Sequence, residues 1–241
     1  RVVRFEFRDP PRSGDDVAVL QNVSKAYGPR VIYDDFDLVV RRRDRWCVMG
    51  RNGAGKTTLL KLVAGAADPD DGRVRIGASV KMGYFAQQSI EVLDPQLTVY
   101  ETAQQAFPTE GQGPLRTLLG AFHFIGEDVD KPTRILSGGE KTRLILALML
   151  FDPPNFLVLD EPTNHLDLET KEMLVEALKD FEGTMLFVSH DRTFLRGLSN
   201  RVLELRPGDG NGTPAQPPRE FEGTYAEYVV ATGEEAPGVH G

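Results

Sequence analysis

An eight-residue stretch, Gly50-Arg51-Asn52-Gly53-Ala54-Gly55-Lys56-Thr57, constrains the fold of this chain most, because it fits the pattern G-x-x-x-x-G-K-[ST]. The residues just before it, 45–49, are mostly apolar, as in a buried strand. The residues after it, 56–66, carry leucines and a valine at helical spacing. Strand, loop and helix therefore follow one another as a phosphate-binding loop requires. A glycine-rich turn without a ligand is the alternative.

The residue types of this loop suit a triphosphate. Glycine tolerates positive φ and lets the backbone approach a ligand, so that consecutive amides can point at an anion at the start of a helix. Lys56 is expected to contact the β- and γ-phosphates, and the hydroxyl of Thr57 to ligate Mg²⁺. The nucleotide-binding residues expected here are Asn52, Gly53, Ala54, Gly55, Lys56, Thr57 and Thr58.

A second, apolar strand is predicted at residues 156–159, and it ends in two carboxylates, Asp160 and Glu161. In a phosphate-loop protein, the first acid at such a strand end holds Mg²⁺, and a neighbouring acid polarises the attacking water. We therefore expect Asp160 to be a metal ligand together with Thr57, and Glu161 to be the catalytic base.

Three isolated polar residues allow two interpretations each. Gln87 ends a predicted strand and could reach the metal or the attacking water through its amide oxygen, or it could be solvated. His190 follows another apolar strand and could bond a γ-phosphate, or it could be structural. Tyr27 lies at a predicted turn and could stack on an adenine, or it could be a buried turn residue.

A second anion-binding helix start is predicted at Ser137-Gly138-Gly139-Glu140. Ser137 is a suitable N-cap, and the two glycines leave amides exposed at the positive end of a helix. A capped helix without a ligand would give the same pattern.

Composition limits the class of protein. The chain has 241 residues, 40% of them hydrophobic and 27% charged, with a formal charge of -8, which argues against nonspecific coating of nucleic acid. Arg41-Arg42-Arg43 is a local basic exception, and a solvated turn is the main alternative to an RNA contact. Cys47 is the single cysteine and excludes an internal disulfide. No signal peptide or membrane-spanning stretch is visible, so we expect a cytoplasmic protein.

Strands alternating with helices predict an α/β fold of the P-loop NTPase type with a mostly parallel core sheet. Residues 1–16 are expected to be the end of a linker or an edge strand, and residues 17–206 the main domain with an inserted helical lobe at about 90–137. Residues 207–241 are expected to be a flexible linker and a short C-terminal extension, with a short strand and helix within 219–230 and a disordered tail.

Taken together, these motifs resemble the ATP-binding-cassette (ABC) family over nearly the whole chain. The matching positions, in the family's order, are Tyr27, Gly50 to Thr57, Gln87, Leu136 to Glu140, Leu159 to Thr163, Asp167 and His190. The resemblance implies an ABC-type ATPase domain with an antiparallel β subdomain and an inserted α-helical lobe. It also implies Mg-dependent ATP hydrolysis with Glu161, His190 and Gln87 as catalytic residues.

Three further stretches, 161–167, 189–195 and 223–228, resemble the ABC-F branch. Members of that branch carry two cassettes in one chain and commonly act on ribosomes. This chain departs from them in having one cassette, and residues 4–11 resemble the join ahead of the second cassette, which predicts the C-terminal half of a longer protein. The chromosome-organising ATPases do not fit, because the 104 positions between Lys56 and Asp160 leave no room for their long coiled coil.

The resemblance further implies that ATP on one cassette is covered by a partner cassette, from the same parent chain or from a second copy. Ser137, Gly138, Gly139, Glu140 and Asp167 would then contact nucleotide across that interface. Two alternatives remain: the ATPase subunit of a membrane transporter, which shares these residues, and a nucleotide-binding module that is inactive without its partner.

Overall fold

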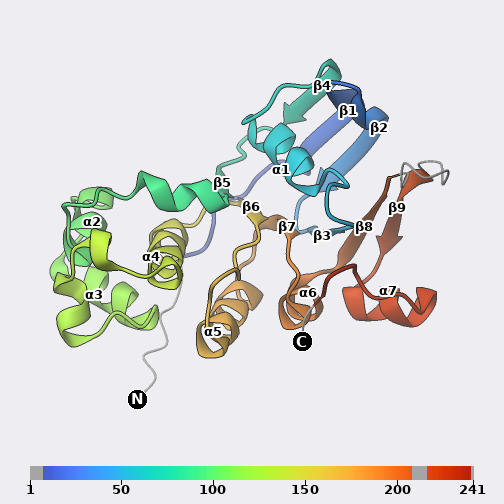
Figure 1. The fold of residues 1–241 in the computed structure, drawn as a ribbon. Coiled ribbons are helices and arrows are strands. Elements are labelled where there is room, and N and C mark those ends of the chain that lie inside the picture. The colour runs from blue at the N-terminus through green and yellow to red at the C-terminus, as the bar shows by residue number, and fades with distance from the viewer. Residues whose placement is uncertain (1–7, 208–215, 240–241) are drawn as a thin grey trace.

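The computed structural model describes residues 8–207 and 216–239; the side chains of Gln87 and Gln88 lie outside the description. It contains a three-stranded antiparallel sheet and a larger, mostly parallel six-stranded sheet, with helices around them (Figure 1). The predicted α/β fold, with a mostly parallel core sheet, an antiparallel subdomain and an inserted helical lobe, is confirmed.

The antiparallel sheet has the order β2-β1-β4, formed by Arg30–Arg41, Asp16–Tyr27 and Asp71–Ile76. Alternate residues of β2 are buried, among them Phe36, Leu38 and Val40. This period of two gives the sheet one apolar face, which packs toward the helix that follows the phosphate loop.

The main sheet has the order β5-β6-β7-β3-β8-β9, and all its neighbouring pairs are parallel except β8 with β9. Its strands are β3 (Arg45–Met49), β5 (Met82–Phe85), β6 (Phe156–Asp160), β7 (Thr184–Val188), β8 (Arg201–Arg206) and β9 (Gln216–Glu222). The central strands β6 and β7 are buried throughout, as expected for strands covered on both faces.

The residues of each strand alternate between two cores. Trp46, Val48 and Val158 face the core shared with α1 (Lys56–Ala64) and the antiparallel sheet. Cys47 and Leu157 face the opposite core, which is shared with α4 (Gly138–Phe151), α5 (Leu168–Lys179) and α6 (Arg192–Leu198). The phosphate loop and its helix are therefore held between the two sheets (Figure 1).

A helical lobe lies between β5 and β6 in the chain and projects to one side (Figure 1). Its elements are the 3-10 helix Gln87–Val92, α2 (Val99–Ala106), α3 (Gln112–Ala121) and the 3-10 helices Gly126–Asp130 and Thr133–Ile135. Thr98 caps α2 in a box with Glu101, which satisfies free amides at that end.

The C-terminal part contains the short strand and helix that were expected within residues 219–230, and the chain just beyond them is packed rather than disordered as expected. β9 pairs with β8, and α7 (Tyr225–Thr232) packs its two tyrosines into the core. Beyond α7, Ala236 is only 6% exposed. The folded body therefore continues past Arg206. An element absent from the sequence prediction is α6, whose seven residues are too few to show a periodic pattern.

The run Arg41-Arg42-Arg43 serves as a turn between β2 and β3. Arg42 pairs with Asp15 at 2.6 Å, and Arg43 pairs with Glu182 at 3.6 Å. Among the described residues, no helix is both long enough and apolar enough to cross a membrane.

Asn155, just before β6, joins three segments. Its Oδ1 accepts a hydrogen bond from the Lys81 amide at 2.7 Å, and its Nδ2 donates to the carbonyls of Pro11 and Ser79, both at 2.8 Å. Because Asn155 is buried, we expect Asn155→Ala to leave these groups unpaired and to lower the free energy of unfolding by about 2–4 kcal/mol in urea titrations.

The exposed Asn200 provides the matched control. It also bridges two backbone groups, at 2.7 and 3.1 Å, but water can replace it there. Asn200→Ala should therefore cost less than about 1 kcal/mol. Equal losses for the two variants would contradict the structural role of Asn155.

Candidate functional site

The phosphate loop forms one wall of a pocket of ≈ 440 Å³ at the carboxyl ends of β3 and β6. Of the predicted nucleotide-binding residues, Asn52, Gly53, Gly55, Lys56, Thr57 and Thr58 line it. Ala54 does not; its side chain is buried, and its amide donates to the Arg51 carbonyl at 3.0 Å.

Two glycines of the loop are required by their surroundings. Gly55 has φ 100° where α1 begins, and a Cβ there would lie 2.5 Å from Cγ2 of Ile32. Gly50 has φ 150°, and a Cβ there would lie 2.7 Å from the carbonyl oxygen of Leu205. The loop can therefore take this backbone path only with glycine at these positions.

Lys56 places its ammonium inside the loop. Nζ donates to the carbonyls of Gly50 at 2.7 Å and Arg51 at 3.2 Å. Burial lowers the pKa of Lys56, and the nearby carboxylates Glu161 and Asp160 oppose that effect. This ammonium lies where it can neutralise phosphate oxygens that enter the pocket.

Two residues of β2 brace the loop from the antiparallel sheet. The Tyr33 hydroxyl donates to the carbonyl of Gly55 at 2.8 Å, and Nη2 of Arg30 donates to the carbonyl of Gly53 at 2.6 Å. Arg30 also lines the pocket. The sequence prediction missed both residues, because no local motif marks them and only the pairing of distant segments brings them to the loop.

Asp160 and Glu161 lie together opposite Lys56. Asp160 hydrogen-bonds Thr57, and its own burial raises its pKa. The hydroxyl of Thr57 and the carboxylate of Asp160 are oxygen donors of the kind Mg²⁺ prefers, with its remaining positions open to water and phosphate. Among the described residues, no group of three or more His, Cys, Asp or Glu forms a complete protein cage for a metal.

Glu161 is held in an uncommon backbone conformation, with φ 52°. Its amide donates to the carbonyl of Val188 at 3.0 Å, which fixes the turn after β6 against β7. Burial raises the pKa of Glu161 to about 7; Asp160 adds to this, whereas the hydrogen bond from the His190 amide and the charge of Lys56 oppose it. A carboxylate with a pKa near neutrality is suited to accept a proton.

His190 contacts Glu161 in two ways. Its Nε2 lies 3.1 Å from Oε1 of Glu161, and its backbone amide donates to Oε2 at 3.2 Å. Both residues line the pocket with Lys56 and Thr57. The structure thus brings together four predicted site residues that are separated by up to 134 positions in the sequence.

Tyr27 lies on the rim of the same pocket. Half of its surface is exposed, and Nζ of Lys25 lies 5.4 Å from the centre of its ring. The alternative of a buried turn tyrosine is therefore wrong, because the side chain is half exposed beside the pocket.

The remaining predicted residues lie elsewhere. Ser137 and Glu140 form a capping box at the start of α4, and Asp167 caps α5 by accepting from the Thr170 amide at 2.8 Å. Gly139 packs closely on the loop before α5, because a Cβ there would lie 2.8 Å from the carbonyl oxygen of His165. Neither these residues nor Gly138 line the pocket. Gln87 begins the 3-10 helix after β5, and its side chain lies outside the description.

The comparisons of this chain with known proteins agree on one family. Residues 33–164 match the sequence model of the family described as ABC transporter. The chain is 42% identical over 213 residues to the probable ATP-binding protein YheS of Escherichia coli K12, which covers 86% of this chain and 33% of YheS. It is 38% identical over 207 residues to ABC transporter F family member 5 of Arabidopsis thaliana, covering 86% and 30%.

The chain thus spans about a third of the length of these relatives. Among solved structures, it is similar to the ATP-binding cassette MJ0796, described as a dimer in a post-hydrolysis state bound to ADP and Pi. The TM-score is 0.67 at 23% identity, covering 85% of this chain and 98% of that one. This likeness shows the fold of an isolated ABC cassette.

The buried carboxyl of Glu161 should make the stability of the nucleotide- and metal-free protein depend on pH. Since its folded-state pKa lies above the unfolded value, its stabilising contribution is complete below about pH 4.5 and is lost as the pH rises through about 7. We expect Glu161→Gln, which stays neutral, to gain stability over wild type by at most about 3 kcal/mol above pH 8, and nothing near pH 4.5.

Urea unfolding in EDTA across this pH range measures the difference. The exposed Glu172→Gln on α5 serves as the control and should show no such pH-dependent gain. A gain for Glu161→Gln that is constant with pH would show that the carboxyl is not desolvated in the folded state.

Proposed function

Because the chain belongs to the ABC transporter family of ATP-binding domains and its relatives include ABC-F family members, we propose that it is an ABC-F type cassette that hydrolyses Mg-ATP. The observation that carries this proposal is the meeting of Lys56, Thr57, Asp160, Glu161 and His190 around one pocket. These residues supply an anion-binding cation, two oxygen donors for Mg²⁺ and a base.

Each residue around the pocket has a role in this proposal. The loop amides and Lys56 hold the β- and γ-phosphates, and the ring of Tyr27 at the pocket mouth offers a face for the adenine. Thr57 and Asp160 hold Mg²⁺, which when bound neutralises phosphate charge. We also propose that Gln87 contributes its amide oxygen, either as a ligand of Mg²⁺ or as a hydrogen-bond acceptor for the attacking water.

Glu161 acts as the general base in this proposal. Its carboxylate accepts a proton from the attacking water, and a pKa of about 7 is matched to that task because about half of the groups are ionised at neutral pH. His190 fixes that carboxylate through its amide and lies with its ring at Oε1, from where it can also contact the γ-phosphate. Losing Glu161 should therefore harm turnover far more than binding.

A partner cassette completes the site. Ser137, Gly138, Gly139, Glu140 and Asp167 lie outside the pocket of their own chain, at the starts of two helices that carry positive dipole ends. We propose that they cover nucleotide held by another cassette, from the same parent chain or a second copy. The dimeric state in which MJ0796 is described supports this arrangement.

The ABC-F relationship suggests where the cycle is used. We propose that, in the longer protein to which this chain would belong as its C-terminal cassette, ATP-gated closure of two cassettes acts on the ribosome in the cytoplasm. The curated relatives favour this over a transporter subunit, since they include a member of the ABC transporter F family.

Glu161→Gln tests the enzymatic proposal. We expect it to bind ATP as wild type does, to form an ATP-dependent complex between cassettes, and to lower the hydrolysis rate by about 10²–10⁴-fold. Equilibrium binding, sedimentation and phosphate release measure the three properties, with Glu172→Gln as the matched control. Normal hydrolysis by Glu161→Gln would remove Glu161 from its role.

The ribosome proposal is tested with the parent protein. Its Glu161→Gln variant should sediment with ribosomes when ATP is present, and Lys56→Ala, which cannot hold the triphosphate, should not. If ribosome binding is absent, or is the same with and without ATP, the translation part of the proposal is wrong, and the hydrolytic part is unaffected.

A further inference from the structure

The chain after α7 runs back across the molecule to the loop that carries His190. Gly238 has φ 77°, and a Cβ on it would lie 3.3 Å from Nδ1 and 3.5 Å from Cε1 of His190. On the other side of the ring, Nε2 lies 3.1 Å from Glu161. The imidazole is therefore confined between the candidate base and the backbone of the C-terminal segment.

Glu235 anchors this segment to the helix that follows His190. Its carboxylate lies 3.5 Å from Nε of Arg192 and 3.5 Å from Nη2 of Arg196, both on α6. It also accepts a hydrogen bond of 2.7 Å from the Tyr225 hydroxyl, which itself accepts from the Ala236 amide at 2.9 Å. These contacts fix the backbone two to three residues before Gly238.

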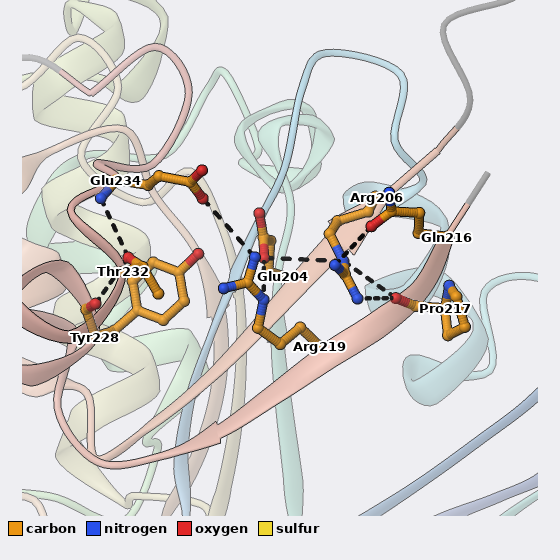
Figure 2. A network of polar contacts seen from close by, with 8 residues as sticks. All are labelled: Glu204, Arg206, Gln216, Pro217, Arg219, Tyr228, Thr232 and Glu234. Atoms are coloured by element: carbon orange, nitrogen blue, oxygen red, sulfur yellow. Dashed lines mark hydrogen bonds and ion pairs between the residues drawn. The ribbon is translucent and has the colours of Figure 1, made fainter. Parts of the chain in front are cut away.

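The start of this segment, at Thr232 and Glu234, is also fixed, as Figure 2 shows. Arg219 of β9 lies between Glu204 of β8, at 3.0 Å, and Glu234, at 3.8 Å. Thr232 closes the last turn of α7 by donating to the Tyr228 carbonyl at 2.8 Å. The segment is thus held at Glu234 by the sheet edge and at Glu235 by α6.

The loop of His190 is also anchored on the side of α5. Asp191 caps α6 by accepting from the Phe194 amide at 3.0 Å and pairs with Lys171 of α5 at 3.1 Å. This anchor fixes the backbone, but it does not touch the imidazole. Gly238 is where the C-terminal segment meets the ring itself.

We propose that residues 235–238 are a positioning element for His190, in which Glu235 fixes the segment on α6 and Gly238 sets the position of the imidazole beside Glu161. The inference rests on the proposed role of His190 in hydrolysis. Residues 235–238 would then influence kcat although they lie about 50 residues after His190 in the sequence, outside the catalytic motifs.

Gly238→Ala tests this position, with Gly233→Ala as its matched control. Gly233 also has positive φ, 72°, but a Cβ there meets nothing within 4 Å. Both variants should therefore carry similar backbone strain and show a similar loss in Tm. Only Gly238→Ala should displace the ring of His190.

We expect Gly238→Ala to lower kcat about tenfold or more, because a small displacement of a catalytic group is costly, and to change KM less than about twofold. Gly233→Ala should leave both near wild type. In NMR spectra of the nucleotide-free chain, the ring signal of His190, assigned by its loss in His190→Gln, should shift in Gly238→Ala and not in Gly233→Ala. Glu235→Ala, which leaves Gly238 intact, should shift it as well.

The proposal would be overturned if the two glycine variants had the same kcat and an unshifted ring signal. It would also be overturned if both variants lost kcat to the same extent. If the wild-type chain does not hydrolyse ATP, the proposed function fails, and the ring spectra alone then decide whether the segment positions His190. An unshifted signal in both Gly238→Ala and Glu235→Ala contradicts the positioning element in that case.

Discussion

The structure depends on the support of the phosphate loop at the start of α1, which is held in place from two sheets. β3 delivers the loop, and β2 of the antiparallel sheet braces it through Tyr33 and Arg30. Such support matters because the first amides of a helix have no hydrogen-bond partner within the helix, so the first turn is easily disordered. Here the start of α1 lies beside the pocket that Gly55, Lys56 and Thr57 line, so that the folding constraint and the capacity to bind an anion have one origin.

The charges around that pocket are balanced against one another. Lys56 is buried among the carbonyls of its own loop, and across from it Glu161 and Asp160 are buried as a like-charged pair. Desolvation lowers the pKa of the lysine and raises the pKa of each acid. Entry of Mg²⁺ and phosphate would supply opposite charges to both sides at once, which is why ligand binding should stabilise this arrangement.

Local patterns in the sequence were sufficient to predict the α/β fold and most of the residues that line the pocket. The glycine-rich loop and the apolar strand that ends in Asp160-Glu161 are continuous stretches of sequence, so each can be recognised from adjacent residues alone. Arg30 and the C-terminal contact of Gly238 could not be predicted, because each depends on segments far apart in the chain that only the folded structure joins. Neither residue belongs to a motif that marks its role.

The central claim is that one cassette holds only part of the site, since the start of α4 at Ser137 lies outside its own pocket. The most direct measurement is the rate of ATP hydrolysis per molecule as a function of protein concentration, for wild type and for Ser137→Arg. The account predicts that the wild-type rate per molecule rises with concentration until pairing is complete, and that the variant stays inactive throughout. A rate per molecule that does not change on dilution, with Ser137→Arg as active as wild type, would contradict it.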